Sequence, residues 1–525
     1  MPSVAAKISP MAVGMAAFAA FGGFLYGYDT GYISGVKEMP AWVAIFGDRQ
    51  PDGTYMLSSG TNSIVTSILS AGTFVGALLA YPAGDFLGRR FGIISFLCLF
   101  FIGVALQTAA TKLSEFAVGR VFAGLGVGGT SCLVPMYQAE CAPKSIRGGL
   151  VACYQWMITI GLLIAAIVVN GTKNINGRAA FQIPIGLQFI WGMILVVGLL
   201  LLPESPRYLL MKGRDEKARK SLSRILRDAP DSQQVNEELA EIAANLHHER
   251  SLGNASYIDC FRSGPGRNAL RTWTGIGLQA LQQLTGINFI FYYGTQFFEN
   301  AGINRPFLIT IATNVVNVGA TIPGIWAVDK LGRRGLLLYG AAGMAVSQLI
   351  VAAVGVATPA NDQTSQKVLI AFVCIFIAHF AATWGPLAWV VTSEIYPTTT
   401  RAKQMSLSTA SNWLLNFGIG YATPYLVDKA PGSAGLQSNV FWIWGGCCVL
   451  CFLFTFFFIP ETKGLSLEQV DILYRNSSIL HSNKFRKQIL AENMHDDDRD
   501  AYMRAPKNTA MTEHKEKAEI DHNSQ

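Results

Sequence analysis

Long apolar runs alternate with short polar segments along most of the chain. A helix needs about 20 apolar residues to cross the hydrocarbon core of a bilayer. Twelve runs are close to this length, at 11–34, 64–83, 91–110, 116–139, 149–169, 183–202, 272–297, 308–328, 335–357, 369–392, 404–427 and 440–459. The pattern therefore predicts an all-α membrane protein with twelve transmembrane helices.

The polar segments divide these helices into two sets of six. Segment 203–271 is the one long polar stretch between apolar runs, and its charged residues recur with helical spacing. We therefore expect a tail at 1–10, a six-helix half at 11–202, a linker with short helices at 203–271, a second six-helix half at 272–459 and a tail at 460–525. The second tail has few apolar residues and many charges, which predicts disorder.

A short motif with an acid, a glycine and two arginines occurs once in each half. It reads DFLGRR at 85–90 and DKLGRR at 329–334, each time between two apolar runs. Further acids and arginines recur in the same order at nearly constant spacing. Such a repeat indicates two halves related by duplication, with a site between them near the midplane, which is the major facilitator fold.

Lysine and arginine are unevenly distributed over the polar segments, and this predicts the orientation. Placing the first tail inside puts most of the 41 basic residues on the cytoplasmic side, as the positive-inside rule requires. Both termini, the linker and the duplicated motifs are then cytoplasmic. The net charge of +7 thus follows from membrane topology and needs no nucleic-acid partner.

The duplicated charges are candidates for a cytoplasmic gate. Opposite charges at the same end of both halves can form ion pairs that hold the halves together in one of two states. The alternative is that they only anchor helix ends. The candidate gating residues are Asp85, Arg89, Arg90, Glu140, Arg147, Glu204, Asp329, Arg333, Arg334, Glu394, Arg401 and Glu461.

Composition and motifs exclude several classes of protein. The chain is 51% hydrophobic and 14% charged, which is too apolar for an ordinary soluble enzyme. Its nine cysteines lie almost entirely in the apolar runs, which predicts free thiols. The sequence contains no metal-ligand spacing, phosphate-binding loop or nucleotide motif. We therefore expect no enzymatic activity, no cofactor and no metal.

Polar side chains inside the apolar runs predict a binding cavity. Amides are costly in hydrocarbon unless they line such a cavity, and they both donate to and accept from the hydroxyls of an uncharged ligand. The alternative is that the amides only join helices to each other. Trp389 and Trp413 add two large flat faces. The candidate amides are Gln155, Gln279, Gln282, Gln283, Asn288, Asn317, Asn412 and Asn416.

Two opposite charges also lie inside predicted helices. Asp29 in the first run and Arg120 in the fourth lie at similar depths from the outer side. Each is too costly to leave unpaired in hydrocarbon, so the two are expected to face each other. A movement that separates them would let Asp29 bind a proton outside and release it inside. The alternative is a permanent ion pair that only fixes the two helices.

Several motifs together resemble the sugar porter family of the major facilitator superfamily. They are GGFLYGYDTG at 22–31, PESPRYL at 203–209, QQLTGIN at 282–288 and PETKG at 460–464. The resemblance runs from about residue 12 to residue 475. WGPLAW at 384–389 and SEIYP at 393–397 are most similar to fungal hexose transporters and plant monosaccharide–proton symporters.

The resemblance implies a plasma-membrane monosaccharide transporter that works by alternating access. It implies glucose or a related hexose as substrate, and protons, coupled through Asp29 and Arg120, as co-substrate. The sugar-binding positions of the family match Gln155, Gln282, Gln283, Asn288, Asn317, Trp389 and Asn412.

The chain also departs from some relatives of this family. Ala381 stands where animal glucose facilitators have a glutamate, and Asp29 where they have asparagine. Leu162 stands where the bacterial xylose–proton symporter has a second glutamine. Alternatives on the same fold stay open: a facilitative hexose uniporter, a sugar sensor, or a porter for a polyol, quinate or a pentose.

Overall fold

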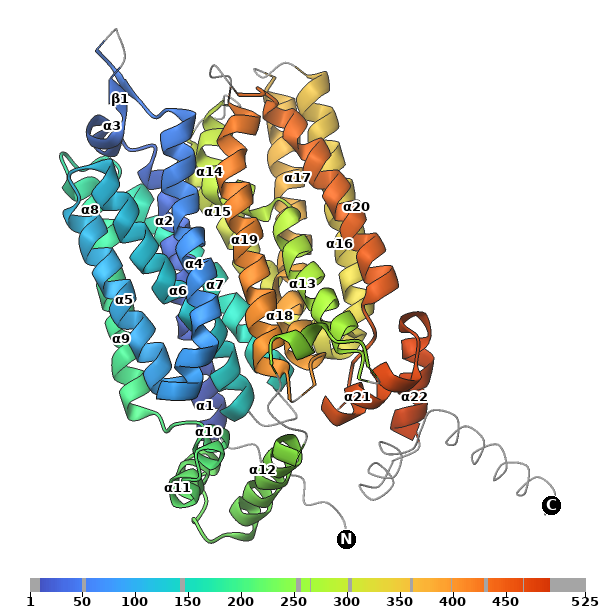
Figure 1. Ribbon diagram of the computed structural model, residues 1–525. Coiled ribbons are helices and arrows are strands. Elements are labelled where there is room, and N and C mark those ends of the chain that lie inside the picture. Colours follow the sequence, from blue (N-terminus) through green and yellow to red (C-terminus); the bar gives the residue numbers. More distant parts are fainter. Residues whose placement is uncertain are drawn as a thin grey trace.

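A computed structural model describes residues 10–49, 53–141, 147–251, 256–264, 266–300, 305–358, 362–397, 399–428, 433–465 and 467–491. Figure 1 shows long helices standing side by side in one bundle, with short helices below the bundle and a small strand pair above it. We call these two sides of the bundle the linker end and the strand end.

Six membrane-spanning units form the first half of the bundle. Two of them are built from two helices each, α1 with α2 and α8 with α9. The bounds are α1 (Pro10–Ala19), α2 (Phe21–Val36), α4 (Ser59–Leu87), α5 (Arg89–Ala109), α6 (Leu113–Cys141), α7 (Arg147–Thr172), α8 (Ala179–Gly186) and α9 (Gln188–Leu201). Each of the six apolar runs predicted for this half lies on one of these units.

The second half repeats this plan. Here α13 with α14 forms the first unit and α17 with α18 forms the fourth. The bounds are α13 (Asn268–Leu284), α14 (Ile287–Asn300), α15 (Pro306–Leu331), α16 (Arg333–Ala357), α17 (Gln363–Ala382), α18 (Trp384–Glu394), α19 (Arg401–Val427) and α20 (Val440–Phe458). The predicted fold of twelve helices in two six-helix halves is therefore confirmed.

Three of the twelve units differ from ordinary membrane helices. In the described part of the chain, nine units are long and apolar enough to cross a membrane by length and composition alone. The other three are α1–α2 and α13–α14, which are interrupted, and α19, which is rich in Ser, Thr and Asn. The second interruption contains Gly286 with a φ of 81°. Interrupted and polar spans are tolerated where they face the inside of the protein.

Short elements lie at both ends of the bundle. At the strand end, α3 (Pro40–Phe46) precedes the antiparallel strands β1 (Asp48–Arg49) and β2 (Tyr55–Met56). At the linker end, Figure 1 shows α10 (Pro206–Met211), α11 (Asp215–Leu226) and α12 (Gln233–Ser251) below the first half, with α21 (Leu467–Asn476) and α22 (Ser482–Ala491) below the second.

The helices α21 and α22 correct the prediction of a disordered tail. Ile472, Leu473 and Ile489 are buried together between these two helices. Arg271 of α13 forms an ion pair with Asp471 of α21. A few well-placed apolar residues and one ion pair thus fold a segment whose average composition is polar. Residues 492–525 of the predicted tail lie outside the described residues.

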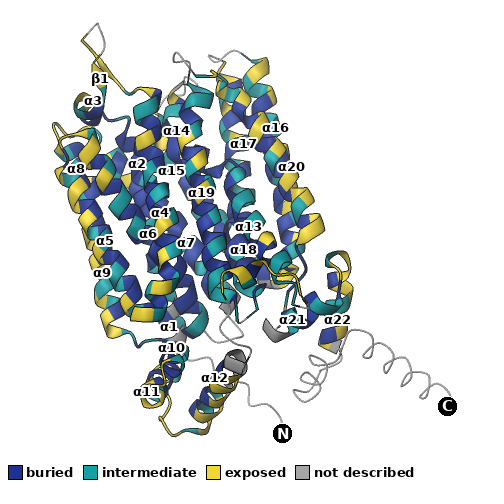
Figure 2. Ribbon diagram, viewed as in Figure 1, coloured by how far each residue is buried: buried dark blue, intermediate teal, exposed yellow. Residues whose placement is uncertain are grey.

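The outer surface of the bundle is apolar. Figure 2 shows buried residues through the middle of the bundle and exposed residues along its outer faces. Large apolar side chains such as Leu200, Ile322 and Trp326 are exposed there, as expected for a surface that contacts lipid. All nine cysteines are described, and none forms a disulfide, which confirms the prediction of free thiols.

The duplicated motif forms the same turn in each half. Gly88 between α4 and α5 has φ 94° and ψ 171°, and Gly332 between α15 and α16 has φ 90° and ψ 170°. A Cβ atom added to Gly88 would lie 2.5 Å from a carboxylate oxygen of Glu204, and one added to Gly332 would lie 2.6 Å from Glu461. Only glycine combines this backbone conformation with room for the carboxylate.

We expect Gly88→Ala and Gly332→Ala to lower the thermal unfolding midpoint of the purified protein. The cost is roughly 1–3 kcal/mol of backbone strain, and the displaced carboxylate adds to it. Gly213→Ala is the matched control, because Gly213 also has a positive φ, 68°, but has no atom within 4 Å of the added Cβ. Equal midpoints for all three variants would show that the carboxylates do not require glycine.

Candidate functional site

Amide side chains of α13 and α19 form a hydrogen-bonded network inside the second half. The Asn412 side-chain nitrogen donates to the side-chain oxygens of Gln279, at 2.7 Å, and Gln282, at 2.8 Å. Gln283 donates to the Asn412 side-chain oxygen at 3.0 Å. All four side chains are buried. The amides predicted from spacing on one helical face are thus brought together, with Asn412 as their common partner.

The network continues into α14 and across to the first half. Asn288 and Asn416 both donate to the Gln283 side-chain oxygen, Asn416 at 3.1 Å. The Asn416 oxygen accepts from the Tyr292 hydroxyl at 2.9 Å and from the Ser70 hydroxyl of α4 at 2.6 Å. Ser70 thus joins the first half to the amides of the second.

The break between α17 and α18 supplies backbone acceptors. Thr383 at this break has φ −131° and ψ −85°. Gln282 donates to the carbonyl oxygens of Trp384 and Gly385, at 3.0 Å each. Gln155 of α7 faces the same turn, because its side-chain nitrogen would lie 3.5 Å from a Cβ atom at Gly385. The structure therefore places Gln155 of the first half opposite the partners of Gln282.

Aromatic side chains also cross between the halves at this level. The rings of Trp389 and Tyr154 meet edge to face with centroids 6.0 Å apart, and those of Trp413 and Tyr26 do so at 5.0 Å. The Trp413 indole donates to the Ser131 hydroxyl at 3.2 Å. The network is therefore enclosed by rings from both halves.

Sequence reasoning missed Ser70 and Ser131 as members of this site. Serine is common in membrane helices, where its hydroxyl usually bonds the carbonyl three or four residues before it. Only the three-dimensional contacts distinguish these two from other serines. For Ser70, a partial signal is that Ser67 and Ser70 lie on one helical face of α4; the sequence offers no such signal for Ser131.

Asn317 of α15 is not joined to this network by any hydrogen bond among the described residues. Its side chain is buried, and its oxygen has no partner in the described part of the chain. A buried amide oxygen without a partner is costly. Its role as a binding residue stays a prediction.

Asp29 and Arg120 face each other inside the first half, as predicted. A carboxylate oxygen of Asp29 lies 3.9 Å from a terminal nitrogen of Arg120, and both side chains are fully buried. That nitrogen donates to the Tyr32 hydroxyl at 2.9 Å, and Tyr32 donates to Gln107 at 2.6 Å. Neither oxygen of Asp29 accepts a hydrogen bond from a described residue. Among the described residues, the carboxylate therefore interacts with Arg120 through charge and not through a hydrogen bond.

Hydrogen bonds also join the halves at the strand end, above the amide network. The hydroxyls of Ser34 in α2 and Thr295 in α14 lie 3.1 Å apart. Ser59 of α4 donates to Asp428, just after α19, at 2.9 Å. These bonds link helices of opposite halves.

The halves also touch at the linker end, below the network. Ser406 of α19 donates to the carbonyl oxygen of Ala77 in α4 at 3.0 Å. The Lys403 ammonium lies 4.8 Å from the ring centroid of Tyr81. The halves therefore touch at both ends of the bundle, on either side of the amide network.

One cluster of charges forms at the linker end of the first half. Arg89 donates to both oxygens of Glu140, with the closest contact at 2.9 Å. Glu204 accepts from the backbone N–H groups of Arg89 and Arg90 at 3.1–3.2 Å. Burial raises the pKa of Glu204, and the N–H groups of Ser205 and Arg90 oppose this rise. The cluster ties the turn after α4 to the ends of α6 and α9.

The second half has a matching cluster. Arg333 donates to both oxygens of Glu394, at 3.2 and 2.8 Å. Glu461 accepts from the backbone N–H groups of Arg333 and Arg334, at 3.0 and 3.1 Å. The duplication seen in the sequence is therefore also a duplication of contacts.

We expected the charges of these clusters to form ion pairs between the halves. The ion pairs found among the described residues instead lie within one half. Asp85 lies 3.6 Å from Arg89, within the first half, and the pairs of Arg89 and Arg333 also stay within their own halves. Arg401 donates to the carbonyl oxygen of Ser393 at 2.7 Å. The side chains of Arg147 and Asp329 lie outside those described. The arginines pair within their own half because the duplication gives each half a complete set of acidic partners.

Residues 15–474 match the family described as "Sugar (and other) transporter". The probable glucose transporter rco-3 of Neurospora crassa is 47% identical over 509 residues, which cover 94% of this chain and 84% of that protein. The high glucose sensor RGT2 of Saccharomyces cerevisiae is 44% identical over 490 residues, which cover 92% of this chain and 63% of the sensor.

The chain is also similar to solved structures. The proton:xylose symporter XylE of E. coli, bound to 6-bromo-6-deoxy-D-glucose, superposes with a TM-score of 0.76 and 29% sequence identity. The superposition covers 88% of this chain and 99% of that chain.

Proposed function

Because this chain belongs to the sugar transporter family of the major facilitator superfamily, we propose that it moves a hexose such as glucose across the plasma membrane by alternating access. The observation that carries the proposal is the buried amide network of the second half, which Ser70 joins to the first half. The similarity to a protein named a probable glucose transporter supports a hexose.

The network suits an uncharged ligand with many hydroxyls. In the described structure its amides hydrogen-bond one another, hydroxyls and backbone carbonyls, and no charged side chain bonds them. Each amide can exchange such a bond for one to a sugar hydroxyl without leaving a buried polar group unpaired. Gln155, Gln282, Gln283, Asn288, Asn317, Trp389 and Asn412 are the proposed binding residues.

We propose that the linker, the duplicated turns and both termini face the cytoplasm, as the distribution of basic residues predicts. The charge clusters then act on the cytoplasmic side. Since their described ion pairs lie within each half, they fix three helix ends against each other there. We propose that this fixed arrangement sets how easily the cytoplasmic side opens.

Proton coupling rests on Asp29 and Arg120. Arg120 lies 3.9 Å from Asp29 and also donates to Tyr32, so it would keep a hydrogen-bond partner if Asp29 became neutral. The similarity to a protein named a proton:xylose symporter supports transport coupled to protons. The alternative, a facilitator with a permanent ion pair, uses the same residues without proton movement.

A sugar sensor is the second candidate function. It is supported by the 44% identity to a high glucose sensor, although the chain spans 63% of that protein's length. Uptake of labelled glucose by cells that lack their own hexose carriers distinguishes the two, because a sensor would bind glucose without moving it. Competition by a panel of hexoses, pentoses, polyols and quinate in the same cells defines the substrate.

We expect Gln282→Leu and Asn288→Leu to raise the apparent KM for the sugar several-fold, on the order of 1–2 kcal/mol of lost hydrogen bonding. Initial uptake rates at equal surface expression measure this. Gln182→Leu is the control, because Gln182 of α8 bonds the carbonyl oxygen of Thr108 and lies outside the network. Unchanged uptake kinetics in both site variants would show that these amides have a purely structural role.

We expect Arg89→Ala and Arg333→Ala to reduce transport more than sugar binding, because they loosen the cytoplasmic helix ends and leave the amide network intact. Uptake in cells and binding in detergent are compared for each variant. Arg262→Ala removes an exposed arginine paired with Asp259 at 2.8 Å and serves as control. A parallel loss of binding and transport would identify the clusters as folding elements.

We expect Asp29→Asn to abolish uptake against a concentration gradient while sparing sugar exchange, because the amide cannot carry a proton. Wild-type uptake should alkalinise the medium and stop when a protonophore is added. Asp48→Asn, in the exposed strand β1, is the control for a lost carboxylate. Wild-type uptake that ignores external pH and the protonophore would make the protein a facilitator.

A further inference from the structure

Basic side chains surround a cavity at the linker end of the first half, away from the amide network. The cavity has a volume of about 420 Å³ and lies where α11 meets the turn after α4 and the segment after α9. Lys217, Lys220 and Arg224 line it from one face of α11, since they are three and four residues apart. Arg90 and Arg214 add two further guanidinium groups.

These positive charges are not neutralised within the described structure. Of the described carboxylates, only Glu204 lines the cavity, and its oxygens already accept the backbone N–H groups of the turn. Arg214, Lys217, Lys220 and Arg224 form no ion pair with a described carboxylate. The cavity therefore has an excess of positive charge that favours an anion.

Two of the guanidinium groups are held in place by the protein. Arg224 donates to the carbonyl oxygen of Leu201 at 3.1 Å, and Arg90 donates to that of Leu202 at 3.0 Å. The Nε atom of Arg90 is buried and has no hydrogen-bond partner among the described residues. These two side chains are thus anchored at the end of α9, and one of them keeps a donor without a partner.

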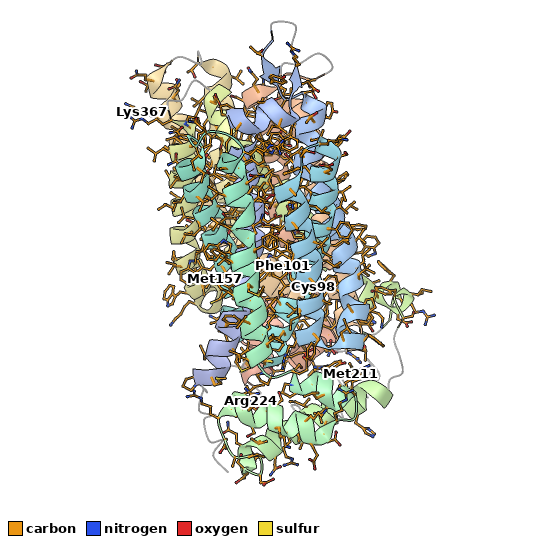
Figure 3. The ribbon with its side chains drawn as sticks, turned by 90° about the vertical axis from the view of Figure 1, so that its left-hand side faces the viewer. Cys98, Phe101, Met157, Met211, Arg224 and Lys367 are labelled. Atoms are coloured by element: carbon orange, nitrogen blue, oxygen red, sulfur yellow. The ribbon has the colours of Figure 1, made fainter. Side chains whose placement is uncertain are left out.

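The edge of this cavity is apolar and belongs to the lipid-facing surface. Leu87 and Phe91 line it and are exposed, and Phe86 and Leu201 beside it are 81% and 69% exposed. Figure 3 shows Arg224 at the lower end of the bundle, below Phe101 and Cys98 on α5. An apolar edge beside clustered cations is the arrangement found where hydrocarbon meets headgroups.

We propose that this cavity binds the phosphate-bearing headgroup of an anionic membrane lipid, whose acyl chains follow the exposed apolar ends of α4, α5 and α9. A phosphate group accepts several hydrogen bonds from guanidinium and ammonium groups at once. A soluble phosphate compound has the same chemistry, but it would leave the apolar edge uncovered. This site is independent of the sugar that the protein transports.

The test is lipid binding to the full-length protein in nanodiscs made of phosphatidylcholine. A short-chain phosphatidylinositol phosphate is titrated against wild type and against the triple variant Lys217→Gln, Lys220→Gln, Arg224→Gln. We expect the triple variant to bind roughly tenfold more weakly or worse, because three of the attracting cations are removed. The control variant carries Arg227→Gln, Lys484→Gln and Lys487→Gln, which removes three cations on the same side of the membrane that do not line the cavity.

Two further ligands test whether the bound phosphate group belongs to a lipid or to a soluble compound. Inositol phosphate, which lacks acyl chains, and inorganic phosphate should bind far more weakly than the lipid. Soluble phosphates that bind as tightly as the lipid would overturn the lipid assignment. Equal lipid binding by wild type and the triple variant, or equal losses in the triple variant and the control variant, would show that the cavity is not the site.

Discussion

The need to satisfy buried polar groups inside the protein governs this structure. A bilayer core offers no hydrogen bonds, so a polar side chain in a membrane span is costly unless it finds a partner within the bundle or lines a cavity. The amides of α13 and α19 do this by bonding one another around Asn412. Asp29 and Arg120 do it by facing each other. The polar groups that would be costly in lipid are therefore gathered at the places proposed to bind sugar and protons.

The same requirement explains how the two halves can move as units. Each half keeps a complete charge cluster at its linker end, with arginine, glutamate and the N–H groups of a glycine turn as mutual partners. The halves pack against each other along α4 with α19 and α7 with α15, and they share hydrogen bonds and ring contacts such as Ser406 to Ala77 and Trp413 to Tyr26. The described ion pairs of the clusters lie within the halves, and this arrangement favours rocking of rigid halves around a central site.

The linker end combines the proposed gate with the proposed lipid site. Glu204 binds the backbone of the first-half turn and also lines the basic cavity. Arg90 contributes its N–H to the turn and its guanidinium to the cavity. A bound anionic headgroup would therefore contact the same turn that ties α4, α6 and α9 together. If both proposals hold, membrane composition would act on the opening of this end.

The sequence by itself determined the twelve spans, the duplication, the opposed charges of Asp29 and Arg120 and the set of amides, because hydrophobic length and the cost of buried polarity act along single helices. Tertiary structure decided the rest. It alone selected Asn412 as the shared partner, brought Ser70 and Ser131 to the site, and kept the ion pairs of Arg89 and Arg333 within their halves. It also folded α21 and α22, where composition indicated disorder. These outcomes depend on which helix faces meet, and that is set by packing between segments far apart in the chain.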